Sequence, residues 1–148
     1  MQLNPYLTFN GQCDAAFKFY ERVLGGKIVA KMTYGDMPAD ACGGKEMPDA
    51  VRKLVAHVRL MVGDVALMGG DAPPDRYQKP QGTMVNIAVT DPGEAERTFS
   101  ALAEGGNVVM PIQETFWARR FGMVTDRFGT PWMINCEKAM SAQKPAAA

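Results

Sequence analysis

The chain has 148 residues, of which 47% are hydrophobic and 22% charged, a composition typical of one globular domain. Its 16 basic and 16 acidic residues balance, so we expect neither nucleic acid nor an anionic membrane surface as a partner. No apolar run approaches the roughly 20 residues of a membrane-spanning helix, and the first residues do not resemble a signal peptide. The three cysteines share no metal-finger spacing, so we expect free thiols and a cytoplasmic protein.

The first predicted elements are a short strand over residues 6–9 and a helix over residues 12–24. In the helix, apolar side chains recur every three or four residues, which gives it one buried face. The pair Gly25-Gly26 ends the helix, because glycine adopts the left-handed conformation of a helix C-cap without steric cost. The chain then returns as a strand over residues 27–34.

Residues 35–54 interrupt this pattern with prolines, a second double glycine and no periodicity. We expect a long surface loop with one helical turn near residues 49–53. Such a loop serves as a lid or binding loop in some proteins and as a plain connection in others, and the sequence leaves both open.

A tight hairpin follows, because two apolar runs over residues 55–62 and 65–68 flank Gly63-Asp64. Residues 70–82 contain several prolines and few apolar side chains, which predicts a linker.

The second half opens with a strand over residues 84–89 and a well-marked helix. Asp91 is a predicted N-cap, Pro92 fits the first helical position and Glu94 completes a capping box. Gly105-Gly106 ends this helix. Strands are predicted over residues 107–110, 122–125 and 131–136, with turn chemistry at residues 126–129.

The stretch over residues 7–29 occurs twice in the chain. A displacement of 80 positions superimposes matching residues on one another: Leu7 on Ile87, Phe9 on Val89, Ala15 on Ala95, Phe19 on Phe99, and Gly25-Gly26 on Gly105-Gly106. Because the stop signals match as well as the apolar positions, duplication explains the similarity better than chance does.

We therefore predict an α+β fold of two βαβββ modules within a single domain over residues 1–138. Module one covers about residues 4–70, a linker residues 71–82 and module two residues 83–137, before a disordered tail over residues 139–148. The two mixed sheets are expected to form a partly closed barrel with the helices outside and a cleft inside.

A paired βαβββ module resembles the vicinal oxygen chelate superfamily, which contains glyoxalases, extradiol dioxygenases and bleomycin-resistance proteins. The motifs that are similar to its PhnB-like branch are residues 5–13, Phe19-Tyr20, Leu67-Met68, Asp71, residues 115–117, Phe121-Gly122, Asp126, Phe128-Gly129 and Trp132. Some members carry a demethylubiquinone methyltransferase label, but no strand here is followed by a glycine loop that could hold a methyl-donor nucleotide.

The resemblance implies that metal ligands, where present, come from the first and fourth strands of each module. The matching positions in this chain are Pro5, Leu67 or Met68, Met84 and Met133. None offers the nitrogen or oxygen donor that such a metal ion prefers, so we expect no metal and no cofactor.

Strand alternation predicts what lines the cleft instead. If Met84 and Met133 face it, Asn86 and Asn135 do too, and we expect Leu7 and Phe9 to join them from the first strand. Such a methionine-rich floor suits a neutral, apolar or aromatic ligand, because thioether side chains repack around varied shapes. The alternative is that these methionines fill a dry core.

Three aromatic side chains, Phe116, Trp117 and Phe121, are expected near the mouth of the cleft. They can form a stacking wall for a planar ligand or a subunit contact in a homodimer. Arg119-Arg120 can hold an anion or lie in solvent as a solvated pair.

His57, the only histidine, is the one weak catalytic candidate. Two hypotheses remain: a binding protein that sequesters a small molecule without metal, and a glyoxalase- or dioxygenase-like enzyme. In the second, metal would be held by His57 with an acidic residue such as Glu46 or Asp71. The predicted ligand-binding residues are Leu7, Phe9, His57, Met68, Met84, Asn86, Phe116, Trp117, Phe121, Met133 and Asn135.

Overall fold

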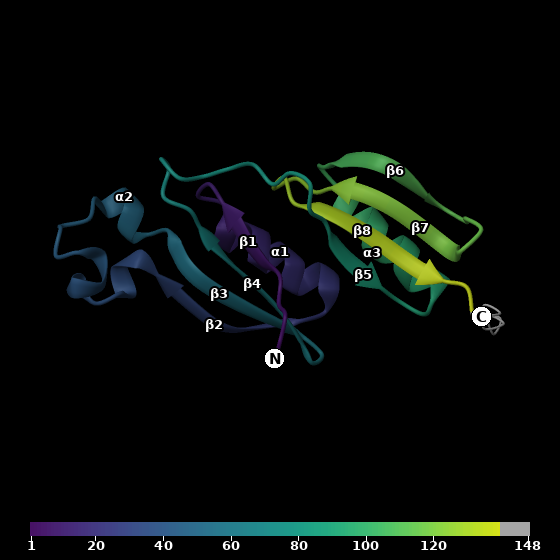
Figure 1. Ribbon diagram of the computed structural model, residues 1–148, viewed down its shortest axis with the longest axis horizontal. Coiled ribbons are helices and arrows are strands. Elements are labelled where there is room, and N and C mark those ends of the chain that lie inside the picture. Colours follow the sequence, from purple (N-terminus) through teal and green to yellow (C-terminus); the bar gives the residue numbers. More distant parts are fainter. Residues whose placement is uncertain (140–148) are drawn as a thin grey trace, which may run out of the picture. The chain divides into compact units, whose positions relative to one another are not determined.

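The computed structural model describes residues 1–139 and contains two compact units, of which the first is Met1–Gln81 and the second begins at Gly82 (Figure 1). Apart from Ala139, the predicted tail over residues 139–148 lies outside the described residues. None of the helices described is both long enough and apolar enough to span a membrane.

The first unit is a four-stranded sheet in the order β1-β4-β3-β2 with one long helix on one face. Its main elements are β1 (Tyr6–Phe9), α1 (Cys13–Leu24), β2 (Lys27–Thr33), β3 (Val55–Val62) and β4 (Val65–Asp71). Strands β1 and β4 are parallel and the other neighbours are antiparallel. The sheet is open, with β1 and β2 at its edges.

The second unit repeats this arrangement in the order β5-β8-β7-β6, again with one parallel pair. Its elements are β5 (Val85–Ala88), α3 (Pro92–Ala103), β6 (Asn107–Gln113), β7 (Ala118–Thr125) and β8 (Pro131–Glu137). The predicted α+β class and the two βαβββ modules are confirmed, and each sheet is open. Several strands are longer than expected: β4 continues to Asp71, and β7 begins at Ala118, so that Phe121 lies within a strand.

The predicted loop between β2 and β3 contains short helical turns. These are η1 (Tyr34–Asp36), η2 (Ala39–Cys42) and α2 (Asp49–Arg52), the last of which is the helical turn expected near residues 49–53. The Asp36 carboxylate accepts hydrogen bonds from the Thr33 backbone N–H and hydroxyl at 2.9 and 2.8 Å, and these bonds fix the start of the loop.

The double glycines Gly25-Gly26 and Gly105-Gly106 have the same two roles in their units: the first glycine ends the helix, and the second lets the chain approach a strand closely. Gly25 and Gly105 have φ values of 66° and 72°, the left-handed conformation that ends each helix. A Cβ on Gly26 would lie 2.5 Å from the Met61 carbonyl oxygen, and one on Gly106 would lie 2.4 Å from that of Thr125. The second glycine therefore allows close approach to the third strand of its unit.

Candidate functional site

One face of each sheet lies against the helix of its unit, and we call the other side the open face. In the second unit, α3 lies on one face of the sheet (Figure 1). A Cβ on Gly122 would meet the Phe99 ring of α3 at 2.7 Å, so this position faces the helix. Because strand residues alternate between faces, its neighbours Phe121 and Met123 lie on the open face. Trp132 and Ile134 are buried, as expected for residues on the helix side.

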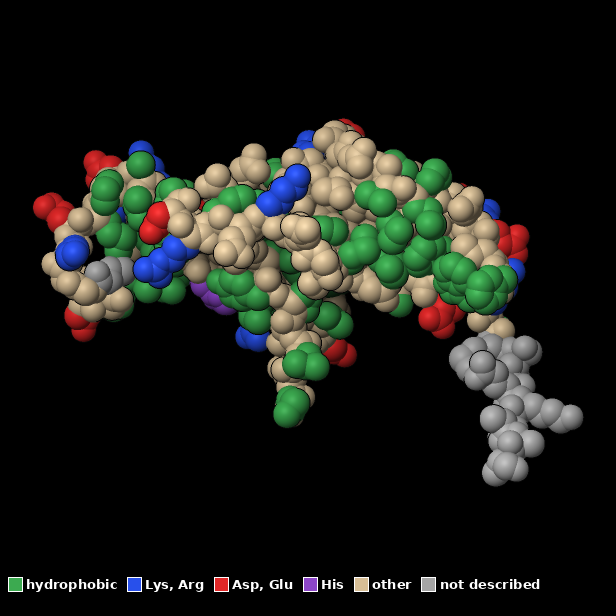
Figure 2. Space-filling model, turned by 45° about the horizontal axis from the view of Figure 1, so that its top comes forward, with side chains coloured by type: hydrophobic (Ala, Val, Ile, Leu, Met, Phe, Trp, Pro, Cys, Tyr) green, Lys and Arg blue, Asp and Glu red, His purple; other side chains and the backbone are tan. Residues whose placement is uncertain are grey.

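Three methionines lie side by side across the open face of the second unit. Met110 on β6 pairs with Met123 on β7, which pairs with Met133 on β8. We call these three residues the methionine row. Asn86 on β5 pairs with Met133 and extends the row to the fourth strand. All three methionines are half-buried. Figure 2 shows hydrophobic side chains gathered over the strands of this unit.

Aromatic rings border the methionine row. The Trp117 and Phe121 rings are 5.2 Å apart, and Phe116 packs edge-on against Trp117 at 4.8 Å. Phe121 is buried, whereas Trp117 is 41% exposed and Phe116 89% exposed. The three predicted aromatic residues therefore do form one cluster, and Phe121 connects it to the sheet.

The polar end of this face is built around Asn135, which pairs with Phe121 on one side and Ala88 on the other. Its Nδ2 donates a hydrogen bond to Glu137 Oε1 at 3.2 Å. Its Oδ1 is buried and has no hydrogen-bond partner among the described residues. A hollow of about 450 Å³ is lined by Asn135 together with Arg119 and Glu137.

Arg119 reaches this hollow because of a register shift in the β7–β8 ladder. Ala118 pairs with Glu137 and Arg120 with Cys136, so Arg119 is the extra residue of a β-bulge. Its guanidinium donates to the Thr90 carbonyl, whereas that of Arg120 pairs with Glu96 of α3. The two neighbouring arginines therefore make contacts on different faces of the sheet. The sequence does not indicate this difference, because a β-bulge has no reliable local sequence signature.

The open face of the first unit is more polar. The Tyr6 ring stacks on His57 with centroids 5.8 Å apart, and the Tyr6 hydroxyl donates to the Ala56 carbonyl at 3.3 Å. A Cβ on Gly70 would lie 2.9 Å from that hydroxyl, so glycine at this position leaves room for the hydroxyl. Partial burial raises the pKa of the Tyr6 hydroxyl, which keeps it protonated as a donor. His57 itself is half-buried, and the Tyr6 ring is its aromatic neighbour.

Arg59 and Met68 pair with each other on the same open face. The Arg59 Nε is buried and has no hydrogen-bond partner among the described residues. Together with Asn135 Oδ1, it is one of two unsatisfied groups of this kind that the described part of the chain contains.

The expected orientation of the first strand is wrong. Phe9 is 2% exposed and packs against Phe17 of α1, with ring centroids 6.1 Å apart. Leu7 pairs with Gly69, where a Cβ would meet the Phe17 ring, so Leu7 also lies on the helix side. The helix core takes the apolar residues of this short strand, and Tyr6 and Thr8 occupy the open face. By contrast, Asn86, Met133 and Asn135 share the open face as expected, and Met84 directly precedes β5.

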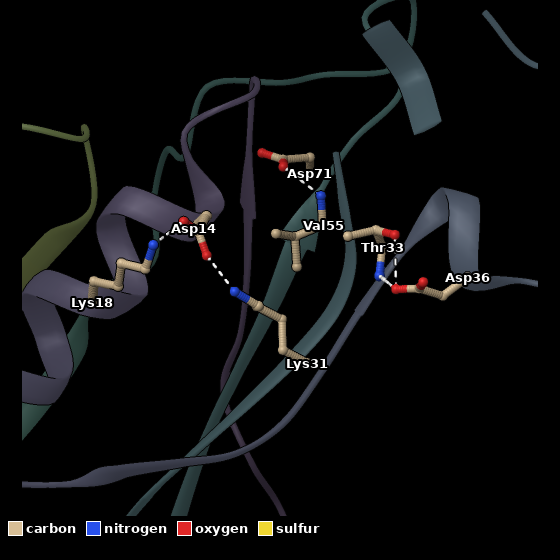
Figure 3. Close-up of polar contacts among 7 residues, drawn as sticks. All are labelled: Asp14, Lys18, Lys31, Thr33, Asp36, Val55 and Asp71. Atoms are coloured by element: carbon tan, nitrogen blue, oxygen red, sulfur yellow. Dashed lines mark hydrogen bonds and ion pairs between the residues drawn. The ribbon is translucent and has the colours of Figure 1, made fainter. Parts of the chain in front are cut away.

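The residues considered for a metal site do not come together in the described part of the chain. There, no group of three or more His, Cys, Asp or Glu side chains is placed to hold an ion. Asp71 Oδ1 accepts the Cys13 N–H at 3.0 Å and Oδ2 accepts the Val55 N–H at 2.9 Å, which Figure 3 shows in part. This buried carboxylate joins the start of α1 to the start of β3. Glu46 lines a separate hollow of about 340 Å³ in the loop before β3.

The remaining chemical candidates have structural roles. Asp126 accepts hydrogen bonds from Phe128 N–H and Thr130 N–H and from the Trp132 indole, at 2.8, 3.0 and 2.8 Å, which is the predicted turn chemistry. Burial and the nearby Asp71 carboxylate raise the pKa of the Cys13 thiol well above its usual range, so it stays protonated and is a poor nucleophile.

Comparison with known proteins places this geometry in a family. A model described as the Glyoxalase/Bleomycin resistance protein/Dioxygenase superfamily matches residues 2–134. Protein YjdN of Escherichia coli (strain K12) is 37% identical over 150 residues, which cover 97% of this chain and 100% of that protein. The crystal structure of protein PA1353 from Pseudomonas aeruginosa is 46% identical, with a TM-score of 0.84 over 94% of this chain and 99% of that one. The PhnB protein of Bacillus cereus, at 20% identity and a TM-score of 0.72 over 91% of this chain and 98% of that one, shares the fold.

Proposed function

Because the chain belongs to the glyoxalase/bleomycin resistance protein/dioxygenase superfamily, we propose that it binds and sequesters an apolar or aromatic small molecule without a metal ion. The observation that carries this proposal is the methionine row beside the Trp117–Phe121 pair. Flexible, polarizable thioethers make favourable contacts with aromatic rings of many shapes. Such a surface recognises a planar ligand by contact area and leaves orientation to a few polar groups.

The residues at the first and fourth strands support binding without metal. Across these strands, Tyr6 pairs with Met68 in the first unit, and Asn86 pairs with Met133 in the second. Neither pair supplies the imidazole or carboxylate donors that zinc, iron or manganese sites use. His57, on β3, stacks on Tyr6 of β1, and no carboxylate is hydrogen-bonded to it among the described residues.

The test uses the neutral probe N-phenyl-1-naphthylamine, whose fluorescence rises in an apolar site. We expect saturable binding, and energy transfer to the probe should lower the emission of Trp117. Trp117→Phe should reduce that decrease, and Trp132, which directly precedes Met133 on β8, should account for the part that remains.

Met123→Arg is the decisive variant, because it places a charge in the middle of the methionine row. We expect it to weaken probe binding at least tenfold. The matched control is Val65→Arg at the hairpin between β3 and β4 of the first unit, where Val65 is 62% exposed, and it should leave binding unchanged. Equal affinity in both variants would contradict the proposal. So would a stoichiometric transition metal in the purified protein that His57→Ala removes, because that result favours the enzyme hypothesis.

The exposed Phe116 supports a second proposal, that the protein forms a homodimer through the aromatic cluster. Phe116, 89% exposed, and Trp117, 41% exposed, form an exposed aromatic patch, and aromatic side chains are enriched at protein interfaces. Light scattering after size-exclusion chromatography should show a dimer for the native chain and a larger monomer fraction for Phe116→Ser. An unchanged mass in the variant would contradict a contact through this residue.

A further inference from the structure

We infer that the ligand is a neutral aromatic molecule bearing an N–H or O–H group, and that Asn135 Oδ1 accepts a hydrogen bond from that group. This inference rests on the proposed function and adds the chemical class of the ligand to it. The evidence is the unsatisfied amide oxygen of Asn135, next to the aromatic cluster, and the hollow that the Asn135 residue lines.

The orientation of the Asn135 amide follows from its neighbour. Nδ2 donates to Glu137 Oε1 at 3.2 Å. Rotating the amide by half a turn would place its carbonyl oxygen against a carboxylate, where neither group can donate. The carboxylate therefore keeps the oxygen of Asn135 directed away from Glu137, as an acceptor.

This acceptor is buried and lacks a partner in the described part of the chain. A buried carbonyl oxygen that accepts nothing loses its hydration without compensation, which disfavours the empty site. A ligand that supplies a donor restores the lost hydrogen bond, whereas a purely apolar ligand leaves the oxygen unsatisfied. The site therefore discriminates between two molecules of the same shape that differ only in this donor.

The position of Asn135 tells where the donor must lie on the ligand. Phe121 is its cross-strand partner on β7, and the Phe121 ring contacts Trp117. An aromatic body lying over these rings and the methionine row would present a substituent at its edge to Oδ1. The hollow of about 450 Å³ leaves room for that substituent.

The charges around the hollow favour a neutral donor. Arg119 and Glu137 both line it, and they bring opposite charges. The Arg119 guanidinium is held by the Thr90 carbonyl, and Glu137 is engaged with Asn135. These opposite charges offset each other, so neither a cation nor an anion gains a net attraction in the hollow and would still lose its hydration there. A phenolic hydroxyl, an indole-type N–H or an amide N–H supplies the donor without that cost.

The test compares 2-naphthol with 2-fluoronaphthalene, which has nearly the same shape but no donor. By isothermal titration calorimetry we expect the native protein to bind 2-naphthol about five- to tenfold more tightly, the effect of one net hydrogen bond. Asn135→Leu should remove this preference by weakening 2-naphthol binding alone. Asn135→Gln, which keeps an amide oxygen and an amide N–H₂, should retain part of the preference and controls for folding.

Asn107→Leu provides the matched control, because it removes an exposed amide at the start of β6, outside the proposed site. It should leave the preference for 2-naphthol intact. If the native protein binds both probes equally, the inference is overturned while the proposed function stands. If neither probe binds, the proposed function fails and the inference fails with it.

Discussion

The two units place four residues at corresponding cross-strand positions of their open faces, and they fill these positions differently. In the first unit the row is Tyr6, Met68, Arg59 and Ala30, and in the second it is Asn86, Met133, Met123 and Met110. Only the methionine of the fourth strand is common to both. On the helix side, by contrast, both units keep a buried phenylalanine at corresponding positions, Phe19 and Phe99. Close packing constrains the helix side, whereas the open face is free to diverge toward binding.

The helix starts differ in the same way. In α3 the N-cap Asp91 lies next to the helix and accepts the Glu94 N–H at 2.9 Å. In α1 the N-cap Gln12 makes no side-chain cap bond, and Asp71 of β4 accepts the Cys13 N–H. The first unit therefore secures its helix from a distant strand. It also carries the long connection over residues 34–54, which residues 114–117 replace in the second unit.

The largest loss of stability that we predict follows from removing the buried carboxylate of either unit, Asp71 or Asp126. This pair of variants tests whether both units depend on such a carboxylate. Asp126→Ala would leave three N–H donors without their acceptor, and Asp71→Ala two. At about 1–3 kcal/mol for each buried donor, both variants should lose several kcal/mol of unfolding free energy, Asp126→Ala more. Urea denaturation at neutral pH measures this.

Asp91→Ala is the matched control, because it removes an exposed cap. It should cost only about 1 kcal/mol. If Asp71→Ala costs no more than Asp91→Ala, the long-range cap of α1 contributes little, and the contrast between the two helix starts is wrong.

The next effect tests the duplicated glycines. Gly26→Ala and Gly106→Ala would each drive a Cβ into a backbone carbonyl of the third strand. We expect both to lose about 1–3 kcal/mol by overpacking, and by similar amounts if the two units are true duplicates.

Gly25→Ala separates sterics from backbone strain. A Cβ there meets nothing within 4 Å, but the φ of 66° still disfavours alanine, at a cost of about 1 kcal/mol. A smaller loss in Gly106→Ala than in Gly25→Ala would show that the strand backbone moves aside and that close approach is not required.

The sequence predicted the helix side of this fold better than the open face. The double glycines, the N-cap Asp91, the proline at the helix start and the apolar periodicity are local signals, and the structure confirms them. The orientation of β1 was predicted wrongly because four residues alternate too briefly to identify the buried face. Phe9 is buried because it packs against Phe17 and Tyr20 of α1, and the sequence alone does not show which strand residue makes these contacts.

The candidate site was predicted only where alternation applies. Asn86, Met133 and Asn135 follow it, but Met110 and Met123 join them through strand register, which the sequence does not encode locally. Likewise, the separation of Arg119 from Arg120 depends on a bulge, and the unsatisfied oxygen of Asn135 depends on its contact with Glu137.

A smaller effect is predicted where the open faces differ most. Arg59→Met would give the first unit the residue type of Met123 at the corresponding position. It removes a buried Nε that has no hydrogen-bond partner among the described residues, so we expect stability to stay constant or rise by about 1 kcal/mol. Thermal unfolding checks this, with Met123→Arg as the reciprocal change, which should destabilise. A clear loss of stability in Arg59→Met would mean that the guanidinium has a partner in solution.

The smallest effect concerns Asp14, which links α1 to β2 in the first unit only. Its carboxylate contacts Lys18 at 2.6 Å and Lys31 at 2.8 Å (Figure 3), and hydrogen bonds from these lysines, Lys18 first, hold the pKa of Asp14 below its usual range. Because the folded pKa lies below the unfolded one, the stabilisation is present above the unfolded value and is lost as pH falls through the folded value.

Asp14→Asn should therefore cost less than about 1 kcal/mol at pH 7, as is usual for exposed ion pairs, and the two proteins should converge in acid. High salt should reduce the difference at pH 7. Lys31→Gln, which leaves the pair within α1 intact, should give a part of the same effect. In the second unit, Glu94, Thr98 and Pro111 stand 80 positions after Asp14, Lys18 and Lys31, so the link has no counterpart there. A difference between Asp14→Asn and the native chain that persists undiminished at pH 2 would show that the carboxylate acts by packing and not by charge.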